Sequence, residues 1–174
     1  MFAEYQRAQG AHKNLCFKFT SGHALAWTAW QKGVRPRVRG SKVTFKKRAA
    51  ASSSYKNFRS YLEMVFMYAG TASMARDTPS VADPGRVQVG DFFLQGGFPG
   101  HAVLVVDVAE NAQGDRMFAL AQSYMPAQEF HLLKGPDGIT PWYPAKSAGI
   151  LQTPEWSFAY SDLRRMPTNP CRNK

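Results

Sequence analysis

Two kinds of apolar spacing divide the chain and restrict the fold that it can adopt. In the first half the apolar residues recur at the 3.6-residue spacing of a helix: Phe58, Tyr61, Leu62, Val65, Phe66, Tyr68 and Ala69, with Gly70 at the end. In the second half short apolar runs between turn residues predict strands at 92–95, 102–108, 117–124 and 129–133. Helices early and an antiparallel meander later predict an α+β fold, an antiparallel sheet with its helices packed early in the chain.

The remaining elements are shorter. We expect a helix over 1–9 ended by Gly10, a strand over 15–19 and a short helix over 23–31. Residues 35–48 predict a hairpin with Gly40 and Ser41 near its turn, because two short alternating runs flank a glycine. Gly, Pro and aromatic residues dominate 135–158, which we expect to be mostly loop.

The chain of 174 residues is long enough for one domain with a real core. We therefore expect a single soluble domain over 1–174, a monomer, with 167–174 as a flexible tail. Its longest apolar runs are far shorter than the roughly 20 residues of a membrane span, so no transmembrane segment is expected. Residues 1–5 lack the basic and apolar regions of a signal peptide.

Positive charge is concentrated in one third of the chain. The formal net charge is +10, yet no acidic residue lies between Glu4 and Glu63, where 13 of the 22 lysines and arginines fall. The densest cluster is a candidate polyanion-binding surface: Arg35, Arg37, Arg39, Lys42, Lys46, Lys47 and Arg48. A plain solvated face, an anionic polymer or membrane surface, and a nucleic acid are the alternatives. Because no zinc finger, helix-turn-helix or aromatic RNA-binding stretch is found, no nucleic-acid partner is expected.

Two cysteines are too few for a disulfide framework, and no residues beside them have the spacing of zinc ligands. Cys16 is expected to be a small buried hydrophobic residue in a strand, and Cys171 an exposed residue of the polar tail. The spacing of histidines, cysteines and acidic residues favours no metal site, and no cofactor loop is found. We therefore expect neither a metal nor a cofactor, and the redox compartment stays open.

His101 is the strongest candidate for chemistry among the four histidines. It begins the most apolar strand and follows a glycine-rich loop, Gly96–Gly100, which allows a ligand to approach the backbone. A histidine has a pKa suited to general-base catalysis. Gln122 lies on the next predicted strand, where its amide oxygen can accept the Nδ1 proton of His101 and orient the ring. A histidine with only a structural role at the strand edge is the alternative.

Long motifs give a first resemblance. The runs Phe19–Gly22, Tyr61–Thr71, Gly90–Ala109 and Ala121–Lys134, followed by Pro141–Tyr143 and Thr153–Trp156, resemble the bacterial family called domain of unknown function 4846. The resemblance covers residues 17–163. It implies a shared fold but brings no established activity.

A second resemblance is to the NlpC-type and CHAP papain-like cysteine hydrolases of the bacterial envelope. There a Gly-Asp, strand, loop, Gly-His, apolar strand pattern holds the catalytic histidine, and Gly90-Asp91 and Gly100-His101 match it. The resemblance implies an NlpC-like core lacking part of its first helix, because the catalytic cysteine of those enzymes would align before Met1. It also implies a substrate cleft near the catalytic histidine, for which the candidate residues are Gly97, Gly100, Ser123, Tyr124, Trp142 and Tyr143.

Two functions follow as expectations. The first is a fragment of a papain-like thiol hydrolase or transferase that acts on amide or ester bonds of the cell envelope, with the nucleophilic cysteine absent from these residues. The second is a non-catalytic module that binds peptidoglycan or another anionic envelope polymer through the basic 35–48 face. A third reading is a chain that folds poorly because half of its first helix is absent. The resemblance implies a periplasmic or envelope-associated location.

Overall fold

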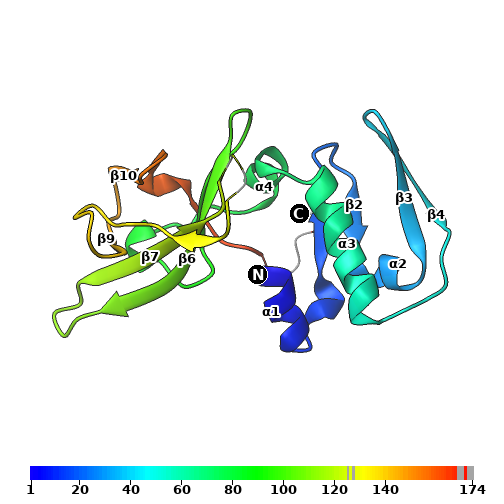
Figure 1. Cartoon of the computed structure of the whole chain (residues 1–174), viewed down its shortest axis with the longest axis horizontal. Coiled ribbons are helices and arrows are strands. Elements are labelled where there is room, and N and C mark those ends of the chain that lie inside the picture. The colour runs from blue at the N-terminus through cyan, green and yellow to red at the C-terminus, as the bar shows by residue number, and fades with distance from the viewer. Residues whose placement is uncertain (125, 127, 168–170, 172–174) are drawn as a thin grey trace. The chain divides into compact units, whose positions relative to one another are not determined.

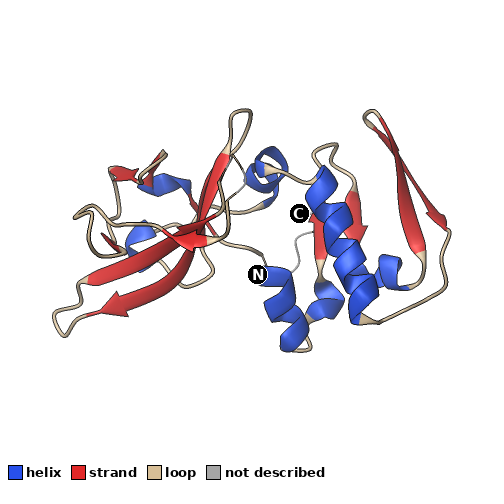
Figure 2. Cartoon of the chain, viewed as in Figure 1, coloured by secondary structure: helices blue, strands red, loops and turns tan. Residues whose placement is uncertain are grey.

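The computed structural model describes residues 1–124, 126, 128–167 and 171, and the chain divides into two compact units. Unit 1 comprises 1–77 and 167–174, and unit 2 comprises 78–166. The longest helix lies in unit 1 and the longest strands lie in unit 2, each strand pair being antiparallel (Figure 1, Figure 2). The prediction of an α+β fold is confirmed.

In its described residues, unit 1 combines four α-helices and a short 3-10 helix (His12–Asn14) with two small hairpins. Its elements are α1 (Phe2–Ala8), β1 (Cys16–Lys18), β2 (Ala24–Ala26), α2 (Trp27–Gln31), β3 (Val34–Arg39), β4 (Lys42–Lys47), α3 (Tyr55–Tyr68) and α4 (Thr71–Asp77). The strands pair as β1 with β2 and as β3 with β4. The predicted hairpin over 35–48 is confirmed, with Gly40 at a positive φ of 56° in its two-residue turn.

The helix α3 forms the core of unit 1 as its sequence spacing predicts. The side chain of Ser54 accepts a hydrogen bond from the backbone N–H of Asn57, which caps the first turn. The apolar stripe then packs Phe58 and Tyr61 against Trp27, with ring centroids 5.2 and 5.5 Å apart. Burial raises the pKa of Tyr61, whose hydroxyl donates to the carbonyl of Leu25. The helix ends at Tyr68, and a further helix that the sequence did not predict, α4, begins at Thr71.

Cys16 and Cys171 form a disulfide within unit 1, with Cα atoms 5.6 Å apart. The prediction that they are a buried and an exposed free cysteine is wrong. The two residues are 155 positions apart, and local sequence patterns carry no information on such a pairing. Most of the predicted tail 167–174 lies outside the described residues.

Unit 2 is built on an antiparallel sheet. Its elements are β5 (Phe92–Gln95), β6 (His101–Glu110), β7 (Arg116–Gln122), β8 (His131–Leu132), β9 (Trp142–Pro144), β10 (Ile150–Gln152), β11 (Ser157–Ala159) and β12 (Leu163–Arg164). The strand order is β12-β5-β6-β7-β8, with β9 also paired to β7, while β10 and β11 form a separate hairpin. The loop predicted over 135–158 therefore contains short strands, because the pairing of β9 with β7 and of β10 with β11 overrides its turn-rich composition.

The core of unit 2 packs large aromatic side chains onto one face of this sheet. The ring of Phe93 stacks on Phe118 and lies edge-on to Tyr160. Residues of β6 and β7 complete the cluster, among them Val103, Val105 and Leu120. None of the helices among the described residues is both long and apolar enough to span a membrane.

Asp91 closes the turn that leads into β5. Its side chain is only 1% exposed and accepts hydrogen bonds from Arg165 Nε and Nη2 at 2.6 and 2.7 Å, and from the backbone N–H of Gln88. These contacts with the Asp91 carboxylate raise the pKa of Arg165. The aspartate of the Gly90-Asp91 motif therefore holds the start of β5 to the end of the unit, next to β12.

Candidate functional site

The register of the sheet places His101 and Gln122 on the same face. Leu104 pairs with Ala121, so the antiparallel ladder puts Val103 opposite Gln122 and His101 two residue pairs further along, on the same face. Both side chains point to the face that carries the core, at the end of the strands where the apolar cluster stops. The predicted proximity of His101 and Gln122 is confirmed.

A chain of hydrogen bonds links His101 to Glu155 through Gln122. The side-chain nitrogen of Gln122 lies 2.8 Å from Glu155 Oε2, and Gln122 Oε1 lies 2.6 Å from His101 Nε2. A carboxylate oxygen only accepts, so the amide nitrogen of Gln122 must face Glu155 and its oxygen must face His101. The amide oxygen likewise only accepts, so Nε2 carries the proton of the neutral imidazole.

The lone pair of His101 therefore lies on Nδ1. In the part of the chain that the structure describes, no protein group forms a hydrogen bond with this atom. The sequence-based expectation that Gln122 contacts Nδ1 is wrong, because the ring presents Nε2 to the neighbouring strand. The contact still orients the ring, and it leaves Nδ1 as the basic atom.

Gln122 is held firmly because its amide is almost fully buried. The residue is 1% exposed, and a buried amide without partners costs free energy. Here Glu155 and His101 satisfy its two ends. The paired arrangement therefore fixes one orientation of the amide.

A tight turn positions Glu155. The backbone N–H and the hydroxyl of Thr153 both donate to the carbonyl of Trp156, at 2.9 and 2.6 Å. The indole N–H of Trp156 in turn donates to Oε1 of Gln95, which is the direct cross-strand partner of His101 on β5. The turn at 153–156 is thereby tied to the strand that flanks the imidazole.

Aromatic rings surround the imidazole of His101. The ring centroids of Tyr124, Trp156 and Phe158 lie 5.1, 5.3 and 6.1 Å from its own. His101, Tyr124 and Trp156 are only partly buried, whereas Phe158 belongs to the core. The imidazole is thus packed on its flanks while its residue keeps some exposure to solvent.

The structure places the other predicted cleft residues at different distances from His101. Gly100 directly precedes it, and Gly97, at a positive φ of 132°, lies in the same β5–β6 connection. Tyr124 contacts the ring, as described above. Ser123 is exposed and follows Gln122, so strand alternation directs it to the opposite face.

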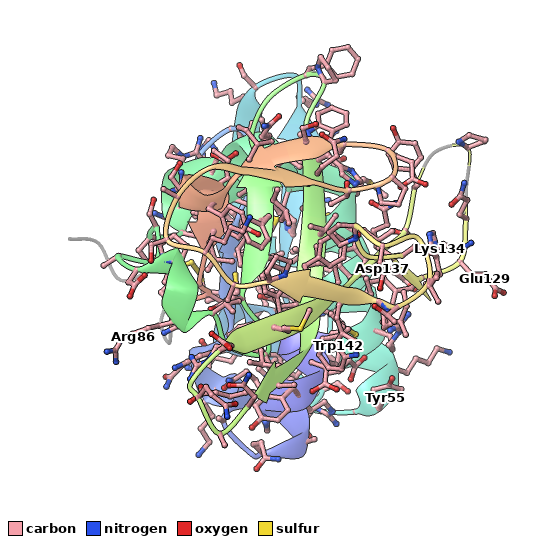
Figure 3. The ribbon with its side chains drawn as sticks, turned by 90° about the vertical axis from the view of Figure 1, so that its left-hand side faces the viewer. Tyr55, Arg86, Glu129, Lys134, Asp137 and Trp142 are labelled. Atoms are coloured by element: carbon pink, nitrogen blue, oxygen red, sulfur yellow. A yellow bond between two sulfur atoms is a disulfide. The ribbon has the colours of Figure 1, made fainter. Side chains whose placement is uncertain are left out.

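Trp142 and Tyr143 lie on β9, which pairs with a part of β7 that is distant from Gln122. They pair with Ala119 and Phe118, which are three and four residues from Gln122, or about 10 Å or more along the strand. Figure 3 shows Trp142 with Lys134 and Asp137, which belong to the connection before β9. Tyr143 is fully buried and stacks on Phe118, so it is part of the core.

The surroundings of Tyr143 and Asp137 shift the pKa values of both side chains. Burial, followed by the charge of Glu155, raises the pKa of Tyr143 to about 12. The hydroxyl of Tyr143 donates to the carbonyl of Lys134. Asp137 accepts from the hydroxyl of Thr140 and from two backbone N–H groups, and these hydrogen bonds lower its pKa.

The residues that sequence reasoning missed are Glu155, Trp156 and Gln95. Glu155 lies 33 positions beyond Gln122, in a turn that no strand pattern announces. Its only signal in the sequence is the Thr153–Trp156 run, which belongs to the family resemblance and implies no role for Glu155.

The chain has two cysteines, and both are bonded to each other. Neither offers a free thiol to His101 in this state. Among the described residues no group of three or more His, Cys, Asp or Glu side chains is placed to hold a metal ion.

The seven predicted polyanion-binding residues lie on or directly after the β3–β4 hairpin. Arg37, Arg39, Lys42 and Lys46 are exposed and share one face, whereas Lys47 belongs to the other. Arg48 is exposed and follows β4, and Arg35 is partly buried against Trp30.

The family model described as Domain of unknown function (4846) matches residues 1–165 of the chain. The chain belongs to this family. Its model spans nearly all of both units and includes His101, Gln122 and Glu155. No curated protein and no solved structure matches the chain.

Proposed function

We propose that His101 is the general base of an acyl-transfer site, in a protein related to the papain-like thiol hydrolases and transferases of the NlpC and CHAP type. The observation that carries the proposal is the hydrogen-bond chain from Glu155 through Gln122 to Nε2 of His101. A histidine with only a structural role needs a hydrogen bond at one ring nitrogen and no particular tautomer. Here Gln122 and Glu155 together select the tautomer whose Nδ1 is free to accept a proton, as a general base requires.

The proposed reaction cleaves an amide or ester bond of cell-envelope material. Nδ1 of His101 takes the proton of a thiol, and the thiolate forms a bond to the carbonyl carbon of the substrate. The tetrahedral adduct then expels the amine or alcohol, which takes the proton back from Nδ1. Water, activated by the same nitrogen, hydrolyses the resulting thioester and restores the thiol; in a transferase another nucleophile takes the place of water.

Gln122 and Glu155 act as positioning residues in this scheme. The amide oxygen of Gln122 keeps its hydrogen bond to Nε2–H while Nδ1 gains and loses a proton. The carboxylate of Glu155 fixes the Gln122 amide in the orientation whose oxygen accepts from Nε2–H. Cys16 and Cys171 bond each other, so neither of them supplies this thiol in the oxidised state.

The disulfide supports a location in the cell envelope. Stable disulfides form in oxidising environments such as the periplasm and the cell surface, and they are rare in the cytosol. Gly90-Asp91 directly precedes β5, and Gly100-His101 leads into β6 with the histidine in contact with Gln122; this arrangement supports the proposed relationship to the NlpC-type enzymes.

The base can be tested without a thiol. Hydroxylamine would serve as the nucleophile and p-nitrophenyl acetate as the acyl donor, with release of nitrophenol followed at several pH values. We expect a rate that rises as imidazole loses its proton and that falls about tenfold or more in His101→Ala. His23→Ala, which removes a partly buried histidine of unit 1, is the matched control and should keep the full rate. Equal rates for the wild type and His101→Ala, with both folded, would refute the proposal.

A further inference from the structure

The β3–β4 hairpin separates its side chains into a cationic and an apolar face. The cross-strand pairs Arg35–Lys46, Arg37–Thr44 and Arg39–Lys42 alternate with Val34–Lys47, Pro36–Phe45 and Val38–Val43. Directly paired residues point to the same side of a sheet, and neighbouring pairs point to opposite sides. One face thus consists of five cations and Thr44.

The other face supplies the hairpin's contact with the core of unit 1. Val43 is buried in the cluster that contains Phe58 and Tyr61, and Val38 packs against it. Figure 1 shows β3 and β4 as a long two-stranded ribbon with a narrow turn. Val38 and Val43 point toward the core, whereas Arg37, Arg39, Lys42 and Lys46 on the opposite face are exposed.

Arg35 is the one cation on this face that has a structural role. Its guanidinium lies 3.8 Å from the ring centroid of Trp30 and donates to Asn57 Oδ1 and to the carbonyl of Trp30. Burial lowers its pKa. The remaining four, Arg37, Arg39, Lys42 and Lys46, are exposed, and we call them the cationic ribbon face.

The cationic ribbon face has no internal counter-charge. No ion pair involves its four residues within the described part of the chain, and the nearest acidic residues in sequence are Glu4 and Glu63. Arg39 and Lys42 lie directly opposite each other, as do Arg35 and Lys46. Like charges that lie directly opposite each other destabilise a sheet. An arrangement that opposes folding locally is typical of a functional surface.

We propose that the cationic ribbon face binds a linear anionic polysaccharide. Alternate residues on a strand lie about 6.6 Å apart, so the four cations form a narrow double row that matches an extended chain of regularly spaced carboxylates. The face carries no aromatic side chain, because Phe45 lies on the other side, and stacking is what single-stranded nucleic acids require. The turn residues Gly40 and Ser41 offer no apolar group for insertion into lipid. This inference is independent of the His101 site.

The test measures binding of a fluorescent polygalacturonate oligomer to the full chain over a series of salt concentrations. We expect the logarithm of the binding constant to fall linearly with the logarithm of the salt concentration. The double variant R37Q/K42Q should weaken it about tenfold or more and lower the salt slope by about one to two. The matched control K47Q/K56Q removes the same charge from exposed residues outside the face and should change the affinity less than about twofold.

Two results would overturn the inference. Equal weakening by both double variants would mean that net charge alone attracts the polymer. Tighter binding of a DNA duplex, or of vesicles containing phosphatidylglycerol, at the same salt concentration would mean that the partner is of another class. Thermal unfolding of both variants checks that each is folded, and R37Q/K42Q should be at least as stable as the wild type because it removes charges from a row of like charges.

Discussion

The carboxylate of Glu155 lies 2.8 Å from the side-chain nitrogen of Gln122 and thereby decides which end of that amide faces His101. The two residues are 33 positions apart, and Glu155 itself makes no hydrogen bond to the imidazole among the described contacts. Its effect on His101 is therefore indirect. Glu155 excludes the flipped orientation of the Gln122 amide. In that orientation the amide NH₂ group would face Nε2 of His101, and Nε2 would have to accept, which favours the Nδ1–H tautomer.

Replacing Glu155 should loosen this selection. In Glu155→Ala the amide of Gln122 loses its acceptor, so both amide orientations become accessible, and we expect the hydroxylaminolysis rate to fall about threefold to tenfold. Glu155→Gln should retain more activity, because its carbonyl oxygen can still accept. Both variants should fold, since Glu155 is exposed.

Glu129→Gln is the control, because only the backbone carbonyl of Glu129 contacts His131 and its side chain projects outward (Figure 3). Full activity in Glu155→Ala would contradict this role.

Arg165 should matter for stability and not for the chemistry of His101. Arg165→Gln leaves the buried carboxylate of Asp91 without its cation, which should cost about 2–4 kcal/mol of unfolding free energy. The matched change Arg86→Gln removes a guanidinium that is 85% exposed and paired with Asp83 at 3.7 Å, and it should cost less than about 0.5 kcal/mol. Urea unfolding of the two variants checks this. Similar losses in both would show that Asp91 does not depend on its partner.

The disulfide should stabilise unit 1. Because it closes a long loop of the unfolded chain, the double variant C16S/C171S should lose about 2–5 kcal/mol of unfolding free energy. Fluorescence of Trp27 and Trp30, both buried in unit 1, reports the transition. Alkylation of the unfolded, non-reduced protein should label no cysteine. Labelling of both cysteines in protein made in an oxidising compartment would disprove the pairing.

Tyr143 should make stability fall at alkaline pH. Its pKa is about 12 in the fold and about 10 in an unfolded chain, so the unfolded state ionises first and stability is lost as pH rises from about 10 to 12. Tyr143→Phe removes this contribution and should flatten the dependence, although Tyr61 and Tyr160, whose pKa values are also raised, keep part of it. At neutral pH the variant should lose about 1 kcal/mol with the hydrogen bond to Lys134. Urea unfolding at several pH values measures both effects, and equal slopes would contradict the assignment.

Local patterns predicted the parts of the fold that depend on neighbours in the sequence. The spacing from Phe58 to Val65 predicted α3, and the strands that carry His101 and Gln122 followed from short apolar runs between turns. Their proximity could be anticipated because consecutive strands of a meander pair. The basic hairpin followed from its glycine turn.

The features of the fold and of the candidate site that the sequence did not predict depend on contacts that no local pattern encodes. The disulfide joins positions 155 residues apart, and β9 forms because β7 offers it a partner far away in the sequence. Glu155 sits in a turn whose position is set by Thr153 and by the bond from Trp156 to Gln95. The pattern of alternating arginines was visible, but only the register shows that Lys47 faces away and that Arg35 is bound to Trp30.

The most direct test of the account is the protonation state of His101. A long-range ¹H–¹⁵N correlation spectrum, recorded at a pH where the ring is neutral, distinguishes the nitrogen that carries a proton from the one that does not. We expect the Nε2–H tautomer in the wild type, lost or mixed in Gln122→Ala and in Glu155→Ala. A single Nδ1–H tautomer in the wild type would contradict the hydrogen-bond chain and, with it, the role of His101 Nδ1 as the base.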